Sequence, residues 1–178
     1  IESNERRIVF TVANEEKTKK LIQAQKRHMH IGVPGHGIVI AVPIKSVGGG
    51  KTVAFLNGET DNAAYTPSLN YAHELIVAVC SQGCTDMVMN AARAAGARGG
   101  TVLHGKGTGA KGAPKFYNIT IAQEKEMILI VAAASQKTAI MQSILKKAGP
   151  DSKAGTIVFS LPTTQVAGFA LLDNQDEA

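Results

Sequence analysis

The chain has 178 residues, of which 44% are hydrophobic and 19% are charged. This composition is that of an ordinary globular protein with one or two modest domains. No apolar run reaches the roughly 18 residues that a membrane-spanning helix needs, and no segment resembles a signal peptide, so we expect a cytoplasmic protein without direct membrane insertion. The formal net charge is +5, but the basic residues are scattered and Trp is absent. Basic faces interleaved with aromatic residues are typical of nucleic-acid binders, so we expect no nucleic-acid partner.

The first third of the chain predicts strand, helix and strand. Residues 5–11 have the pattern of a strand, and Asn14, followed by two glutamates, is typical of a helix N-cap. Leu21, Ile22 and Ala24 give this helix an apolar face, and we expect it to end near Arg27. A turn rich in glycine and proline at 30–37 and an apolar strand at 38–44 follow.

The segment after this strand is rich in glycine and turn-forming residues, so we expect residues 50–72 to form a linker. Within it, residues 53–56 are candidates for a short extra strand. Beyond it, Thr85 is the expected N-cap of a helix that Gly96 terminates. The elements predicted here are strands at 74–79, 100–104, 126–132 and 156–161 and helices at 85–95 and 135–148. This β-α-β-β-α-β order predicts an α+β, ferredoxin-like fold with a long loop in its middle.

The first third of the chain aligns with the end of the second half. Residues 6–10 align with 126–130, residues 38–43 with 157–162, and Val47 with Val166. We therefore predict a tandem duplication whose first copy lacks its N-terminal β-α-β. Because such a half-unit leaves strand edges open, we expect about 60 further residues before Ile1, or another chain, to complete it. The expected divisions are a partial repeat at 1–49, the linker at 50–72, a complete domain at 73–172 and a tail at 173–178.

The stretch from Gly99 to Gly112 is rich in glycine and contains Lys106 and Lys111. Glycine lets backbone N–H groups approach an anion, so this stretch is a candidate phosphate site, although it lacks the spacing of a Walker A motif. The alternative is a flexible loop. The loop continues to Phe116 and Tyr117, an aromatic pair that either contacts a partner protein or folds back onto the sheet.

Other candidate groups point to little chemistry. Cys80 and Cys84 lie too far apart in sequence for a C-x-x-C motif, so they are either two reduced thiols or a redox switch. The histidines of the first third have no carboxylate or thiol at ligand spacing, so we expect turn residues rather than a metal site; they are His28, His30 and His36. The sequence shows no nucleophile–base pair and no paired carboxylates, so we expect no enzyme activity.

Several motifs together resemble the nitrogen regulatory PII signalling family, in particular its divergent PII-like branch. They are Ala94-Ala-Gly-Ala-Arg-Gly-Gly-Thr-Val-Leu, Gly105-Lys-Gly-Thr-Gly, Glu124-Lys-Glu-Met-Ile-Leu-Ile-Val and Gly155-Thr-Ile-Val-Phe-Ser-Leu-Pro. The resemblance covers residues 74–169 and implies a small sensor, usually a homotrimer, that binds adenine nucleotides in clefts between subunits. It also implies a long T-loop, here about 107–123, that contacts a transporter or an enzyme, often in nitrogen metabolism.

The resemblance also assigns residues. The implied ligand-binding positions are Gly105, Lys106, Gly107 and Thr108 at the base of the T-loop, Lys125 at its far end, and Lys153, Gly155 and Thr156 in the B-loop. The implied partner-binding positions are Gly109, Lys111, Phe116 and Tyr117. Thr156 stands where the family has a phosphate-contacting lysine, so the ligand, with ATP, ADP and AMP as candidates, stays open.

Three functions therefore follow from the sequence. The first is a PII-like regulator, not an enzyme, that assembles as a homo-oligomer and senses a small anionic ligand. The second is an assembly module of the same fold without a ligand. The third is a metal-handling protein on a ferredoxin-like scaffold.

Overall fold

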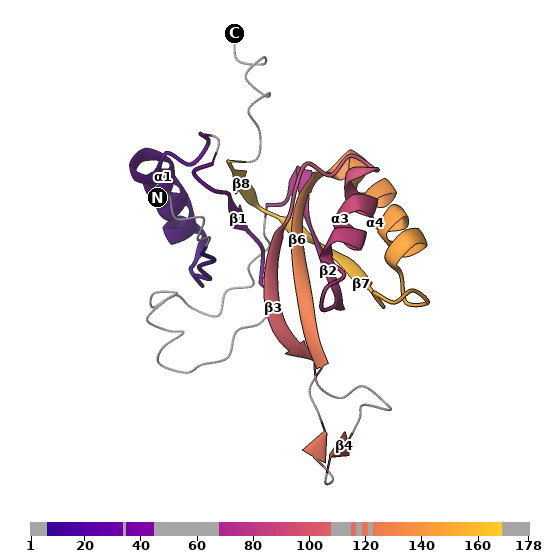
Figure 1. The fold of residues 1–178 in the computed structure, drawn as a ribbon. Coiled ribbons are helices and arrows are strands. Elements are labelled where there is room, and N and C mark those ends of the chain that lie inside the picture. The colour runs from indigo at the N-terminus through magenta and orange to yellow at the C-terminus, as the bar shows by residue number, and fades with distance from the viewer. Residues whose placement is uncertain are drawn as a thin grey trace. The chain divides into compact units, whose positions relative to one another are not determined.

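The computed structural model describes residues 7–33, 35–44, 68–107, 115–116, 119–120 and 123–168 (Figure 1). The chain divides into two compact units. The first unit comprises Ile1–Pro67 and Ala167–Ala178, and the second comprises Ser68–Val166. The predicted short strand at 53–56 lies outside the described residues.

The second unit is built on a four-stranded antiparallel sheet with the strand order β3-β6-β2-β7. Its strands are β2 (Asn70–Ser81), β3 (Thr101–Gly107), β6 (Gln123–Ala133) and β7 (Ile157–Thr163). Helix α3 (Thr85–Arg93) follows β2, and helix α4 (Ala134–Ala148) follows β6. The element order is therefore β-α-β-β-α-β, which confirms the ferredoxin-like fold predicted for this half of the chain.

Both helices cover the same face of this sheet (Figure 1). Side chains alternate between the two faces of a strand, so every second residue of β2 and β6 points toward the helices. The core between sheet and helices includes Ile76, Ile128, Ile130, Val88, Ile140 and Ile144, all fully buried. Burying one such side chain contributes about 1.5–3 kcal/mol, so this core accounts for most of the driving force for folding of the unit.

The intervening residues give the opposite face of the sheet an apolar surface. Val77 of β2 lies beside Leu129 of β6 and Phe159 of β7, and the next row contains Val79, Met127 and Ile157. Three of these side chains are substantially exposed, namely Met127 at 39%, Phe159 at 43% and Ile157 at 64%. Neither α3 nor α4 packs on this face.

The start of α3 differs from the prediction. Cys84 is the N-cap and its side chain forms no capping hydrogen bond, whereas Thr85, the expected cap, is the first helical residue. The capping acceptor is instead the carboxylate of Glu126, which comes from strand β6. Helix α3 ends at Arg93, two residues before the predicted end, and Gly96, with φ of +102°, closes the turn that follows.

The first unit contains helix α1 (Glu15–Met29), and Asn14 is its N-cap as predicted. The Asn14 Oδ1 accepts a hydrogen bond of 2.9 Å from the Lys17 N–H. The predicted apolar face is narrower than expected. Ile22 is buried, but Leu21 is 38% exposed and Ala24 is also exposed.

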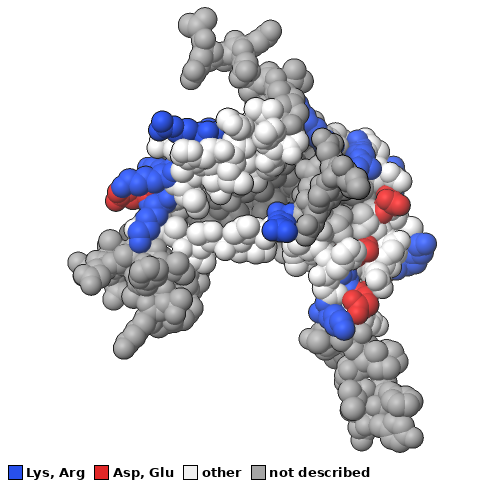
Figure 2. Space-filling view, turned by 60° about the vertical axis from the view of Figure 1, so that its left-hand side comes forward, with Lys and Arg blue, Asp and Glu red and all other residues white. Residues whose placement is uncertain are grey.

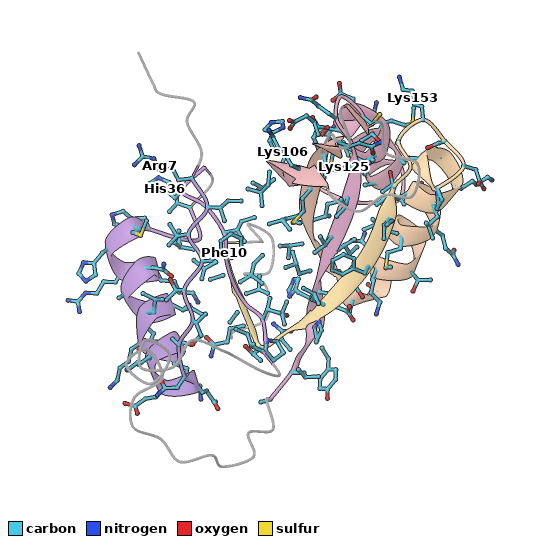
Figure 3. All side chains as sticks on the ribbon, turned by 90° about the horizontal axis from the view of Figure 1, so that it is seen from below. Arg7, Phe10, His36, Lys106, Lys125 and Lys153 are labelled. Atoms are coloured by element: carbon cyan, nitrogen blue, oxygen red, sulfur yellow. The ribbon has the colours of Figure 1, made fainter. Side chains whose placement is uncertain are left out.

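The strand predicted at 5–11 is wrong for its described part, because residues 7–14 form no strand. Val9 is 82% exposed, as is Phe10 (labelled in Figure 3) at 81%. A strand needs a neighbour to receive its backbone hydrogen bonds, and in the described part of this unit no strand pairs with this segment.

The strand predicted at 38–44 is shortened to β1 (Val39–Ala41). It lies in a two-stranded sheet whose other strand, β8 (Gln165–Ala167), ends in the first unit and was not predicted. Ala167 packs there with Ile22 and Ile31. Gly168 follows with φ of +84°, and a Cβ at this position would lie 2.3 Å from the Gly37 carbonyl oxygen. This position therefore requires glycine.

Candidate ligand-binding site at the base of the long loop

Four of the predicted ligand-binding residues lie together at one end of the sheet. Gly105 of β3 is paired with Lys125 of β6, and Gly107 is paired with Gln123. Lys106, between the two glycines, lies opposite Glu124. Figure 3 shows Lys106 and Lys125 at the ends of these two neighbouring strands. Residues 108–122 connect the same two strand ends. The strand-end residues 105–107 and 123–125 therefore form the base of the predicted T-loop.

Much of the loop itself lies outside the described residues, and with it Thr108, Gly109, Lys111 and Tyr117. Within the loop, the backbone of β4 (Lys115–Phe116) pairs with that of β5 (Ile119–Thr120). Phe116, the remaining predicted partner contact, is therefore in a short antiparallel pair.

Among the residues that the structure describes, the two lysines at the loop base have weak partners. The Lys106 Nζ lies 3.5 Å from Glu124 Oε1, and these side chains are 69% and 45% exposed. Such a surface ion pair is worth about 0–1 kcal/mol. The Lys125 Nζ donates to Ser81 Oγ at 3.3 Å. On the face in Figure 2, basic and acidic side chains are interspersed among uncharged ones. The loop base therefore offers one lysine ammonium group on each face of the sheet, which an anionic ligand can recruit at little cost.

The other predicted ligand residues lie at the opposite edge of the same sheet. Lys153, Gly155 and Thr156 form part of the turn between α4 and β7. Because β3 and β7 are the outer strands of the four-stranded sheet, three strand spacings of about 4.8 Å separate them, or about 14 Å. Figure 3 shows Lys153 apart from Lys106 and Lys125. Within one second unit, Lys106 is therefore remote from the α4–β7 turn, whereas Lys125 contacts Ser81, whose N–H donates to Ala154 of that turn.

The α4–β7 turn is tied to the turn between β2 and α3. The Ser81 N–H donates to the Ala154 carbonyl oxygen at 2.9 Å. The Cys84 thiol lies 4.0 Å from the Lys153 carbonyl oxygen. Thr156 is fully buried, and among the described residues its hydroxyl has no hydrogen-bond partner. Its side chain is therefore not presented to a ligand, whereas Lys153 is exposed.

Glu126 is the main polar residue of this region that sequence reasoning missed. Its side chain is 7% exposed, and its Oε2 accepts hydrogen bonds from the Thr85 N–H at 3.2 Å and the Thr85 hydroxyl at 2.6 Å. Its Oε1 lies 3.7 Å from His104 Nδ1. Hydrogen bonding by Thr85 holds the pKa of Glu126 below its usual value, against the opposing effect of burial. The available signal was the inward-facing position of Glu126 in its strand.

The buried Cys80 thiol has little reactivity at neutral pH. Cys80 and Cys84 are both free and buried, and burial, with a smaller contribution from Glu126, raises the pKa of Cys80 to about 11. Cys80 is therefore a protonated thiol at neutral pH, which favours the interpretation as reduced structural thiols.

In the first unit, the His30 and His36 rings are 6.0 Å apart, and the His36 Nδ1 lies 3.2 Å from the Met29 carbonyl oxygen. Within the described ranges, no three or more His, Cys, Asp or Glu side chains are grouped to hold a metal ion. The helices described here also include none that is long and apolar enough to cross a membrane.

The second unit is thus a ferredoxin-like α+β domain with a loop inserted between its second and third strands. The family model described as Nitrogen regulatory protein P-II matches residues 73–169, which is more than half of the chain. The chain therefore belongs to the P-II family.

Comparisons with single proteins are more distant. The chain is similar to PII from Arabidopsis thaliana bound to citrate, with 20% identity and a TM-score of 0.40 over 51% of this chain and 77% of that one. It is also similar to a Bacillus cereus protein related to NIF3, with 15% identity and a TM-score of 0.41 over 58% of this chain but only 29% of that one. No curated protein matches the sequence. Neither structural likeness is close enough to support an argument about function.

Proposed function

We propose that this protein is a regulator that binds a small anionic ligand at the base of the 107–123 loop and signals to a partner protein through that loop. Membership of the P-II family suggests a regulatory signalling protein, and such proteins are typically not enzymes. The observation that carries the proposal is the pairing of Gly105 with Lys125 and of Lys106 with Glu124. Lys106 and Lys125 project from opposite faces of the two strands from which the loop departs, so a ligand bound by either lysine contacts the loop base and changes the energy of loop conformations.

The proposed ligand carries phosphate groups, with ATP, ADP and AMP as candidates. Two ammonium groups and two glycines at the loop base suit phosphate oxygens, because lysine supplies charge and glycine lets backbone N–H groups approach. Within one second unit the α4–β7 turn is remote from Lys106, so Lys153 and Gly155 act together with Lys106 from a neighbouring subunit in this proposal. Thr156, whose side chain is fully buried, positions the α4–β7 turn in this proposal and does not contact the ligand as a charged group.

Assembly through the apolar face of the sheet follows from this arrangement. A face that exposes Met127, Phe159 and Ile157 is costly in water, and burial against a second copy removes that cost. A symmetric homo-oligomer also supplies the neighbouring turn that the site needs.

Light scattering tests the assembly. Replacing Ile157, which is 64% exposed, by Asp changes the apolar face but little of the folded core. We expect Ile157→Asp to dissociate the oligomer. Leu145→Asp is the matched control, because Leu145 is 45% exposed but lies on α4. An unchanged molar mass for Ile157→Asp would exclude this face as the interface.

We also propose that the first unit is the back half of a second, partial copy of the P-II-type domain. Helices α1 and α4 both have 15 residues, and they start at Glu15 and Ala134, an offset of 119. The same offset aligns β1 with the middle of β7. The proposed divisions remain a partial repeat at 1–49, a linker at 50–72 and a complete domain from 73.

Calorimetric titration with ATP, ADP, AMP and cyclic AMP tests the ligand. Losing one charge-assisted hydrogen bond costs about 1.5–3 kcal/mol, so Lys106→Ala and Lys125→Ala should each weaken binding by roughly tenfold to hundredfold. Lys146→Ala, in the last turn of α4, is the control that should bind normally. Absence of heat with all four nucleotides would remove them as ligands and favour an assembly module without a nucleotide.

A further inference from the structure

The carboxylate of Glu126 is a largely buried charge near the loop-base end of β6. Glu126 lies in β6 between Cys80 of β2 and His104 of β3, and its side chain is 7% exposed. A buried charge is costly unless it is hydrogen-bonded, and leucine or isoleucine would fill the same inward-facing position at no such cost. The position therefore needs a reason beyond packing.

The contacts of Glu126 join three segments of the chain. Its Oε2 accepts from the N–H and the hydroxyl of Thr85, at 3.2 and 2.6 Å, at the start of α3. The Gly83 backbone also lowers the pKa of Glu126, so the turn before this helix lies close to the carboxylate. Its Oε1 lies 3.7 Å from His104 Nδ1, next to Gly105 at the loop base. One side chain thus connects both strands of the loop base with the β2–α3 turn.

That turn continues the connection to the far edge of the sheet. The Gln82 N–H donates to the Glu124 carbonyl oxygen at 3.3 Å, and the Ser81 N–H donates to that of Ala154 at 2.9 Å. Ala154 lies in the α4–β7 turn, between Lys153 and Gly155. The two groups of proposed ligand residues, which lie at opposite edges of the sheet, are therefore both attached to the β2–α3 turn.

We propose that Glu126 is a positioning residue that couples the base of the 107–123 loop to the α4–β7 turn through the β2–α3 turn. A change at either ligand-contacting segment shifts the turn that Glu126 holds, and so shifts the other segment. The coupling itself is a property of the folded chain, and its use as a signal rests on the proposed function.

Amide hydrogen exchange of the full chain without ligand tests this coupling. We expect Glu126→Gln to accelerate exchange at least about tenfold at three places together, which are residues 83–86, 103–107 and 150–155. Exchange in the half of β2 distant from Glu126, residues 74–77, should not change. Glu74→Gln is the matched control, because Glu74 is also a partly buried carboxylate, 2.8 Å from Lys137 Nζ, but lies at the other end of β2.

A pair of substitutions at Thr85 guards against a variant that does not fold. Thr85→Val removes the hydroxyl that donates to Glu126 and should reproduce the joint acceleration, whereas Thr85→Ser keeps the hydroxyl and should restore slow exchange. Acceleration confined to residues 83–86 would show that Glu126 only caps α3 and would overturn the proposal. A uniform acceleration over the whole sheet would overturn it as well, since it would reflect global stability. Because no ligand is added, the exchange experiment tests the coupling even if the nucleotide titrations show no binding.

Discussion

Replacing Glu126 by Ala should destabilise the second unit by about 3 kcal/mol at neutral pH. The variant removes the acceptor of two Thr85 donors, so the N–H and the hydroxyl of this first residue of α3 lose their carboxylate partner. Hydrogen bonds to a charged group are worth about 1.5–3 kcal/mol, and a negative charge at a helix N-terminus adds about 0.3–1 kcal/mol. The relief of burying one charge offsets part of this sum. For a domain of this size, the melting temperature should fall by roughly 15 °C.

The loss should depend on pH in a defined direction. The pKa of Glu126 is lowered in the folded protein from its model-peptide value of 4.5, chiefly by hydrogen bonding with Thr85. A lowered folded-state pKa means that the ionised carboxylate stabilises the protein fully above about pH 5. This stabilisation disappears as the pH falls through the folded-state pKa. The difference between wild type and Glu126→Ala should therefore shrink steadily below about pH 4.5.

Urea unfolding followed by far-ultraviolet circular dichroism, from pH 7 to pH 3, measures both effects, since the chain has no Trp to report fluorescence. A loss below about 0.5 kcal/mol at pH 7 would show that water replaces the carboxylate adequately. A loss of equal size at pH 7 and pH 3 would show that the ionised form has no special role. Either result would refute the prediction that the ionised Glu126 carboxylate stabilises the start of α3.

Two further predictions concern glycines with matched controls. A Cβ at Gly100 would lie 3.0–3.2 Å from three core side chains, so Gly100→Ala should cost about 1–3 kcal/mol in thermal unfolding, whereas Gly99→Ala, with no atom within 4 Å, should be nearly neutral. Gly168→Ala should speed amide exchange of residues 39–41 by releasing the end of β8, because its Cβ would lie 2.3 Å from the Gly37 carbonyl oxygen. Gly35 has the same φ of +84° but open space around it, so Gly35→Ala should leave that exchange unchanged and separate the steric clash from backbone strain. Equal effects of Gly100→Ala and Gly99→Ala on thermal unfolding, or of Gly168→Ala and Gly35→Ala on exchange, would contradict these steric contacts.

The order of elements in the second unit could be predicted from the sequence because local signals and packing agree there. Residues 74–79 alternate toward a helix-covered face and an apolar face, and Gly96 marks the end of α3. Strand ends were less predictable. The β2 strand starts at Asn70 and β3 extends to Gly107, because neighbouring strands continue the hydrogen-bond ladder past the apolar residues.

The errors arose where structure depends on distant partners. Residues 7–11 have the residue types of a strand, but a strand forms only beside another, and Val9 and Phe10 are exposed. The cap of α3 comes from Glu126, which lies 41 residues after Thr85 and follows no local capping pattern. The base of the candidate site was predicted because Lys106 and Lys125 flank one loop. The separation of Lys153 from Lys106 depends on strand order, which residue types alone do not reveal.

Proteolysis of the 107–123 loop is a direct test of whether a ligand at the loop base controls the loop. The loop contains Lys111 and Lys115, after which trypsin cleaves. If a ligand at the loop base controls the loop, at least one of ATP, ADP, AMP and cyclic AMP should change the rate of cleavage at these lysines by about tenfold, and Lys106→Ala should abolish the change. Identical cleavage rates with and without every nucleotide, in a protein that still assembles, would contradict the account and identify the chain as an assembly module.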